Sequence, residues 1–264
     1  MNKIKYVTNE FFSHEGILFR ASLSYGFLLT LFPSLIIMVI LFQYGILDYI
    51  TSTQFIYNYF PADVIQPFIE FVMLQDYSNI LTVFLTIGAV SFLASRSFYS
   101  FLLISANHEE FETYAFVIRL KAIVVFIAFI AGILIVSMWS HIFNTRVGFT
   151  VPIGMFTLFY FLFRVLSFEK RPWQYGLLGS FVTTIGIGII GLLFLSLIHT
   201  FTRYDTFYGP LSSILILLIS THFIASVIYL GYCINHAFDY HLPNKEYKNA
   251  FIYRFFNSFG RRFK

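Results

Sequence analysis

The last long apolar segment of the chain, residues 210–236, carries polar side chains at helical spacing. His222, Tyr229 and His236 are seven residues apart, so on a helix they lie close to one line. Histidine exchanges a proton near neutral pH, and an ionisable side chain deep in an apolar segment usually faces the interior of a helix bundle or water. The pattern predicts a titratable centre at His222, with Ser226 beside it. A neutral histidine that is hydrogen-bonded to a neighbouring hydroxyl is the simpler alternative.

The first apolar segment, residues 21–47, has a row of small and hydroxyl side chains at intervals of four: Ser22, Gly26, Thr30 and Ser34. In lipid such a row lets another helix approach closely and form hydrogen bonds across the contact. Pro33 donates no backbone hydrogen bond and frees the carbonyl of Leu29, so we expect the helix to kink or thin there. Freed backbone at membrane depth must be buried in protein or line a wet cavity. The row therefore faces inward, either as a packing surface or, together with Tyr25, as the wall of a polar path.

Two further sets of residues are candidates for packing or for binding. The fifth apolar segment repeats the spacing of four with Gly176, Ser180, Thr184 and Gly188. Because nothing in this row ionises, it predicts helix packing. Arg96 and Arg164 lie within the second and fourth apolar segments. They either extend to the nearby headgroups or form a cationic lining for an anionic substrate such as a phosphate-bearing lipid.

A membrane-embedded helical bundle would position these residues. Of the 264 residues, 58% are hydrophobic and 11% are charged, whereas a soluble domain has about 25% charged residues. Six segments approach the length of about 20 apolar residues that a transmembrane helix needs: 21–47, 79–102, 120–143, 151–168, 175–199 and 210–236. The predicted fold class is all-α, a polytopic membrane protein with six transmembrane helices.

The positive charges predict how this bundle is oriented. With six spans, fifteen of the seventeen Lys and Arg residues fall on the side that holds both termini, and only Arg146 and Arg203 fall on the other. Positively charged loops stay in the cytoplasm. We therefore expect a multi-pass protein of the plasma membrane with both termini cytoplasmic.

The segments outside the six spans predict interfacial helices. Residues 1–20 form an amphipathic N-terminal helix, residues 239–264 a basic amphipathic tail, and residues 48–78 one or two short helices in the outer loop. With the six-span bundle at 21–238, they make one membrane domain, 1–264. The expected partners are membrane lipids, with anionic headgroups at the basic tail. Nucleic acid is not expected, because aromatic residues at helical spacing suit a membrane interface better than a phosphate backbone. A homo-oligomer is left open.

Familiar catalytic patterns are missing. The sequence HEEFE at 108–112 lacks the second histidine of a two-histidine zinc helix, so it is interpreted as a solvated acidic patch. No CxxC pair, phosphate-binding loop or nucleophile elbow occurs, and the single cysteine, Cys233, excludes an internal disulfide. We therefore expect no catalytic residues, no metal site and no cofactor, and an enzyme is the weaker class.

Several stretches resemble the YihY/BrkB family of bacterial inner-membrane proteins: RASLSYGFLLTLFPSL (20–35), WQYGLLGSF (173–181), YGPLSSILILL (208–218) and LGYCIN (230–235). The resemblance covers essentially the whole chain and implies a role in envelope integrity or in moving lipid or envelope precursors. Cys233 stands where the family often has glutamate, and Thr221 and His222 stand in place of a tryptophan. Some members carry an older ribonuclease label, but this sequence shows no acidic metal site and no histidine pair placed for phosphodiester cleavage.

The sequence therefore favours a transporter or flippase-like protein for a lipid or an anionic envelope compound. The first, fifth and sixth segments would enclose the path. Pro33 would provide a bend, His222 a titratable centre, and Arg96 and Arg164 an attraction for negative headgroups. The alternative is a non-transporting membrane scaffold for envelope maintenance. A membrane-associated ribonuclease is the least favoured of the three.

Overall fold

The structure, a computed structural model, describes residues 3–43, 66, 70, 74, 80–111, 113–142, 147–201 and 205–238. Every regular element in these ranges is a helix, as the all-α fold class predicts. The helices are α1 (Lys3–Phe11), α2 (His14–Gln43), α5 (Ile80–Ala94), α6 (Arg96–His108), α7 (Ala115–Ile142), α8 (Val147–Leu166), α9 (Leu177–Phe201) and α10 (Asp205–Ala237).

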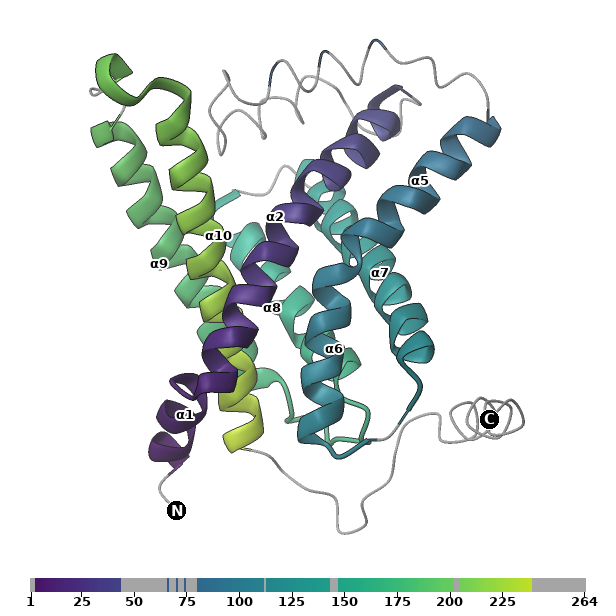
Figure 1. The fold of residues 1–264 in the computed structure, drawn as a ribbon, viewed down its shortest axis with the longest axis vertical. Helices are drawn as coiled ribbons and strands as arrows, with labels where there is room; N and C mark the ends of the chain where they lie inside the picture. Colours follow the sequence, from purple (N-terminus) through teal and green to yellow (C-terminus); the bar gives the residue numbers. More distant parts are fainter. Residues whose placement is uncertain are drawn as a thin grey trace.

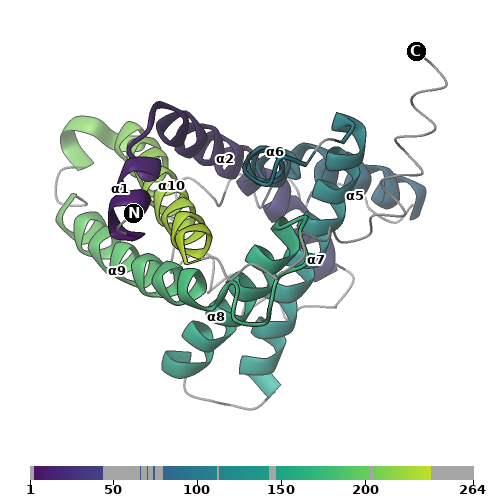
Figure 2. The same ribbon diagram turned by 90° about the horizontal axis from the view of Figure 1, so that it is seen from below.

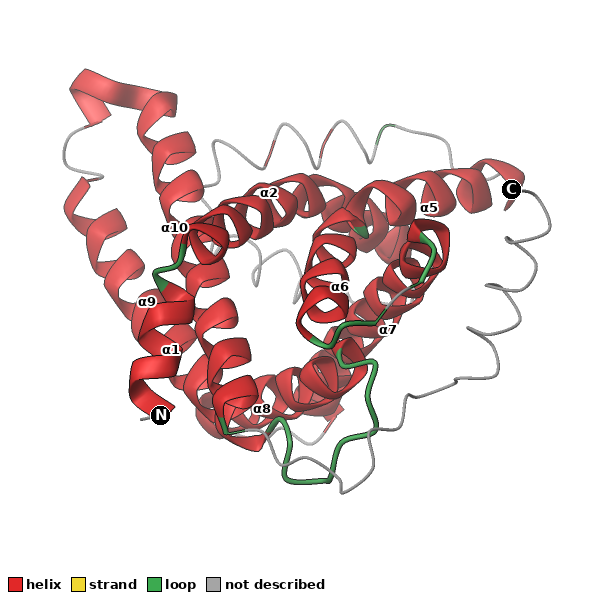
Figure 3. Ribbon diagram, turned by 60° about the horizontal axis from the view of Figure 1, so that its bottom comes forward, coloured by secondary structure: helices red, strands yellow, loops and turns green. Residues whose placement is uncertain are grey.

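The long helices pack side by side into a closed ring. Around the ring, α10 packs on α9, α9 on α8, α8 on α7, α7 on α6, α6 on α2, and α2 on α10 (Figures 1 and 2). The helix α1 packs on α10 and α2. One end of the bundle holds α1, the C-terminal ends of α6 and α10 and the α8–α9 connection at residues 167–176, and it is called the lower end after its place in Figure 1. In Figure 3 this end is turned forward.

The outward faces of the helices are apolar. Three described helices contain a stretch long and apolar enough to cross a membrane: Ala115–Gly132, Leu177–Phe194 and Leu217–Ala237. Only 28%, 22% and 39% of the residues in these stretches are buried inside the protein. Water would penalise so much exposed apolar surface, whereas hydrocarbon does not. The chain therefore has the surface of a membrane protein.

The bent pair of α5 and α6 would be a fourth span, and the apolar part of α8, Val151–Leu166, is shorter than a full crossing. Six spans thus remain a prediction. The two helices of the pair meet at Ser95 at an angle of 42°. Near the bend, the Phe92 carbonyl accepts hydrogen bonds from the Ser95 hydroxyl at 2.8 Å and from Arg119 Nη2 at 2.6 Å. These side chains give the Phe92 carbonyl hydrogen-bond donors beside the bend. Lipid has no donor to offer at this position.

The predicted bend at Pro33 and the predicted interfacial helices are only partly within the described residues. The helix α2 continues through Pro33. The predicted N-terminal helix at 1–20 is divided, because α1 ends at Phe11 and α2 begins at His14. The basic tail at 239–264 lies outside the described residues. In the outer loop only three residues are described, and there the Leu74 amide donates to the Glu70 carbonyl at 3.0 Å, as in a helix.

A close helix contact joins α9 to α10 through two glycines. A Cβ atom on Gly179 would collide with the Gly231 carbonyl and the Asn235 amide, and a Cβ atom on Gly231 would collide with the Thr183 hydroxyl. The Asn235 Oδ1 atom accepts a hydrogen bond from the Gly179 amide at 2.8 Å. The residues of α9 that meet Gly231 are Gly179 and Thr183. Each lies one position before a residue of the predicted row. Of the predicted residues, Ser180 is fully buried, whereas a Cβ atom on Gly188 would meet nothing within 4 Å.

Replacing Gly231 by Ala should destabilise the protein by about 1–3 kcal/mol, because the added methyl group overpacks the α9–α10 contact. The matched variant Gly188→Ala adds the same methyl group where nothing lies within 4 Å. It should leave stability unchanged or raise it. Unfolding of both purified variants by sodium dodecyl sulfate measures the difference. Equal stability of the two variants would contradict this contact.

Candidate functional site

A chain of titratable side chains joins three helices at the lower end. His108, the last residue of α6, places Nε2 at 3.0 Å from Glu10 Oε1 of α1 and Nδ1 at 3.2 Å from the hydroxyl of Tyr232 in α10. The Tyr229 hydroxyl donates to the same Glu10 oxygen at 3.4 Å. The side chains of His108 and Glu10 are 18% and 22% exposed, whereas Tyr229 is completely buried. The chain of hydrogen bonds therefore leads from a partly accessible pair into the bundle.

Stacked rings hold His108 in this position. Its ring lies nearly parallel to Tyr232, at 5.7 Å and 11°, and to His236, at 5.2 Å and 18°. Tyr6 of α1 lies 6.2 Å from the His236 ring. Because rings on α1, α6 and α10 contact one another, the mutual position of these three helices fixes the hydrogen-bond geometry.

The hydrogen bonds of His108 fit either protonation state of its ring. A neutral His108 that carries its proton on Nε2 donates to Glu10 and accepts from Tyr232 at Nδ1. A protonated His108 donates from both nitrogens and forms an ion pair with Glu10. The two states differ by one proton and by the direction of one hydrogen bond. The hydrogen-bonded chain Glu10–His108–Tyr232 is called the relay below.

The turn between α1 and α2 positions Glu10. The Ser13 hydroxyl donates to the Glu10 carbonyl at 2.8 Å and accepts from the Gly16 amide at 2.9 Å. A Cβ atom on Gly16 would collide with the Glu10 carbonyl, so the chain can reverse here only with glycine. The Arg20 guanidinium stacks on the Phe11 ring at 4.0 Å and ties α2 back onto α1.

A second polar cluster is a buried charge network beside the relay. Glu109 accepts from the Ser167 hydroxyl at 2.6 Å and from the backbone amides of Phe168 and Glu169 at 2.6 and 3.1 Å. Arg171 Nη2 lies 2.8 Å from Glu169 Oε2 and 3.4 Å from Glu109 Oε1. The three charged residues are 3–6% exposed. The interpretation of HEEFE as a solvated acidic patch was therefore wrong for Glu109, which anchors the α8–α9 connection under α6.

Arg164 also stabilises this connection. Its guanidinium donates to the carbonyls of Pro172 at 2.8 Å and Arg171 at 3.3 Å, and it stacks 4.9 Å from Trp173. Gly176 follows with a φ of +101°, a conformation that favours glycine, and turns the chain into α9. These contacts use much of the hydrogen-bonding capacity that a cationic lining would offer to a ligand.

The structure brings together only part of the predicted path. Tyr229 donates to Glu10, and His236 stacks on His108. Gly26 is buried against Ser97 of α6. His222 is exposed, as are Ser22, Tyr25 and Arg96; the Ser22 and Ser100 hydroxyls are 3.3 Å apart, and the Ser226 hydroxyl donates to the His222 carbonyl at 2.8 Å. The side chains of Thr30 and Pro33 lie outside the described ones. Over the described ranges, no group of three His, Cys, Asp or Glu side chains is placed to hold a metal ion.

Sequence reasoning missed Glu10, His108 and Tyr232. Glu10 and His108 lie in the last turns of α1 and α6, where a polar residue normally contacts water. Tyr232 lies within α10 but off the predicted polar line of that segment, so no periodicity marked any of the three. A usable signal was the pair His108–Glu109 at the end of an apolar segment, because both side chains at such a boundary must be solvated or paired.

The all-helical fold with its apolar outer faces defines the class: this is an integral membrane protein. Residues 7–250 match the family described as "Virulence factor BrkB", and the chain belongs to that family. A relative is the ribonuclease-like protein YfkH of Bacillus subtilis (strain 168), which is 28% identical over 265 residues that cover 89% of this chain and 94% of YfkH. No solved structure matches the chain.

The variant Arg171→Leu should destabilise the protein by about 3–5 kcal/mol, because it leaves two buried carboxylates without their cation. Lys170→Leu removes the same charge from the neighbouring residue, which is exposed, and should have a small effect. Denaturant unfolding of the two purified variants provides the comparison. A loss of stability in Arg171→Leu no larger than in Lys170→Leu would contradict the network.

Proposed function

We propose that the chain is a membrane transport protein that moves a lipid-like or anionic compound of the cell envelope. The observation that supports the proposal most is the relay of Glu10, His108 and Tyr232, which links α1, α6 and α10 through hydrogen bonds of 3.0 and 3.2 Å. Ionisable residues that pair inside a membrane bundle commonly belong to proton relays or substrate pathways. A rigid membrane anchor has no need of such a chain.

The relay also connects elements that could move relative to one another. The helix α1 is short and is joined to α2 through the turn at Ser13, and α6 is separated from α5 by the bend at Ser95. Protonation changes the bond between Glu10 and His108, and therefore the contact between α1 and α6. In this proposal the relay controls the cytoplasmic opening of a path along α2, α9 and α10, with both termini in the cytoplasm.

A scaffold without transport is the second candidate, and the aromatic packing of the bundle favours it. Phe101 lies 5.2 Å from Tyr232, and Phe98 lies 6.0 Å from Phe126, with ring planes inclined by 61° and 60°. Such contacts suit a closed, static bundle. The scaffold accounts for the packing but assigns no role to the titratable chain.

A ribonuclease, the activity in the name of YfkH, is the third candidate. Metal-dependent cleavage of RNA by the purified protein, abolished by Glu109→Gln and Glu110→Gln, would support it over transport. We expect no cleavage, because Glu109 already accepts three hydrogen bonds and lies within 3.4 Å of Arg171.

Transport is tested in vesicles that contain the purified protein and a fluorescently labelled phosphatidylglycerol. Labelled lipid should cross the bilayer faster than in vesicles without protein. Glu10→Gln and His108→Phe should slow it by about tenfold or more, the effect of losing a hydrogen bond to a charged group. Glu15→Gln, which changes an exposed carboxylate in the first turn of α2, is the matched control.

Equal rates in vesicles with and without the protein would reject lipid transport and leave the scaffold. Transport by the wild type that is unchanged in Glu10→Gln and His108→Phe would reject the relay. Gel filtration and circular dichroism of each variant establish that it is folded.

A further inference from the structure

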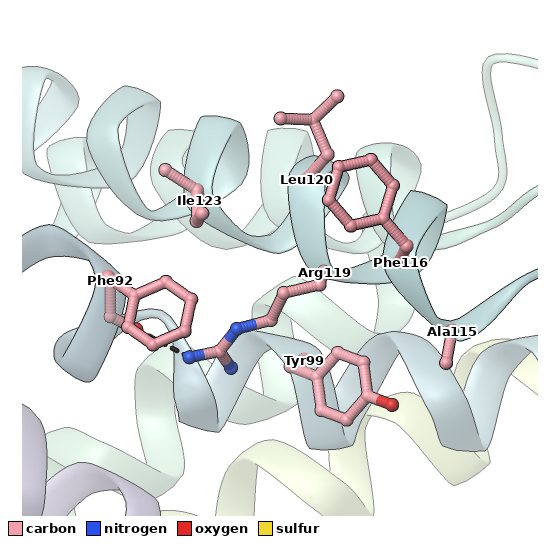
Figure 4. A pocket seen from close by; sticks show the side chains of 7 residues that line it. All are labelled: Phe92, Tyr99, Ala115, Phe116, Arg119, Leu120 and Ile123. Carbon is pink, nitrogen blue, oxygen red and sulfur yellow. Dashed lines mark hydrogen bonds between the residues drawn. The ribbon is translucent and has the colours of Figure 1, made fainter.

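An open apolar groove lies beside the bend between α5 and α6. It has a volume of about 400 Å³ and is lined by Phe92, Tyr99, Ala115, Phe116, Arg119, Leu120 and Ile123 (Figure 4). Phe92, Phe116 and Leu120 are 52%, 68% and 47% exposed. In a protein whose outer faces contact hydrocarbon, exposed aromatic and aliphatic side chains of this kind contact lipid. The groove therefore opens toward acyl chains.

One cation lies in the groove and a second lies close by. Arg119 donates from Nη2 to the Phe92 carbonyl at 2.6 Å, and its guanidinium lies 4.3 Å from the Phe92 ring centre and 5.5 Å from that of Tyr99. A guanidinium has five N–H donors, so most of them remain for a ligand. Arg96 is exposed and begins α6 three residues before Tyr99, so the two side chains share one face of the helix.

Within the part of the chain that the structure describes, neither cation has a carboxylate partner. Arg164 donates to two backbone carbonyls, those of Pro172 and Arg171, whereas Arg119 donates to one. Two adjacent positive charges at a lipid-facing surface are costly unless an anion approaches them.

We infer that this groove binds one anionic phospholipid, with its phosphate between Arg96 and Arg119 and an acyl chain along Phe92, Phe116 and Leu120. Arg119 is the fifth residue of the apolar stretch Ala115–Gly132, so it lies near an end of a membrane span, where headgroups are found. Charge complementarity selects a negative headgroup, and the apolar wall selects a lipid over a soluble phosphate. The inference adds a lipid class and a site to the proposed function, but binding does not require transport.

Native mass spectrometry of the full-length protein, mixed with equal amounts of phosphatidylglycerol and phosphatidylcholine, tests the site. The wild type should retain phosphatidylglycerol preferentially. Arg96→Gln and Arg119→Gln should each reduce this preference by about tenfold, the usual effect of losing a charge-assisted hydrogen bond. Arg96→Lys should retain part of it. The control Lys5→Gln removes one exposed positive charge from α1 and should behave as the wild type.

Two further experiments are needed. One separates the effect of the groove's charge on binding from that of its shape, and the other distinguishes a bound lipid from bound free phosphate. Ala115→Phe fills the groove without changing its charge, and it should weaken retention of phosphatidylglycerol. Inorganic phosphate at millimolar concentration should not displace the lipid. Arg96 is exposed, so we expect Arg96→Gln to fold, and it remains informative if Arg119→Gln does not fold.

Three results would overturn the inference. They are equal retention of the two lipids by the wild type, retention by Arg96→Gln equal to that by Lys5→Gln, and displacement of phosphatidylglycerol by inorganic phosphate. Because the assay measures binding alone, a protein that binds the lipid here and fails to move it in vesicles retains the site and loses only the proposed transport.

Discussion

Hydrocarbon offers no hydrogen-bond partner, and this constraint accounts for where the polar atoms of the protein lie. Every backbone group inside the bilayer must be satisfied within the protein. Where α5 and α6 meet at an angle, at Ser95, side chains donate hydrogen bonds to the Phe92 carbonyl. Where two helices must touch, at Gly179 and Gly231, the absence of side chains brings the backbones together, and Asn235 satisfies a buried amide. Apolar faces are left for lipid.

The same constraint gathers the charged groups at the lower end. Glu109, Glu169 and Arg171 are nearly inaccessible, and Arg171 pairs with both carboxylates. Together they fix the α8–α9 connection. Glu10 and His108 are less buried and are paired through one hydrogen bond. The first set suits a rigid support, because breaking it is costly in any state. The second can change with a single proton. A fixed support next to a titratable contact is an arrangement that a moving protein can use.

Composition and periodicity predicted the helical fold and the membrane class, and the resemblance of several stretches predicted the family. It also identified α2 as a helix that closely approaches another, which Gly26 and Ser97 now show. It did not predict contacts between residues distant in the chain. His108 meets Glu10 across 98 positions, and Glu109 meets Phe168 across 59. The row predicted to pack on α9 differs by one position from the residues that meet α10. Equal spacing cannot tell which face of a helix meets its neighbour.

Chemical labelling in intact cells tests the membrane arrangement most directly. Cys233 is the only cysteine and is completely buried, so Cys233→Ser gives a background in which single cysteines can be placed. Asn107, exposed at the lower end of α6, and Leu74, 83% exposed and just before α5, are suitable positions. A membrane-impermeant maleimide should label a cysteine at position 74 in intact cells and one at position 107 only after permeabilisation. Labelling of both positions in intact cells would contradict the arrangement.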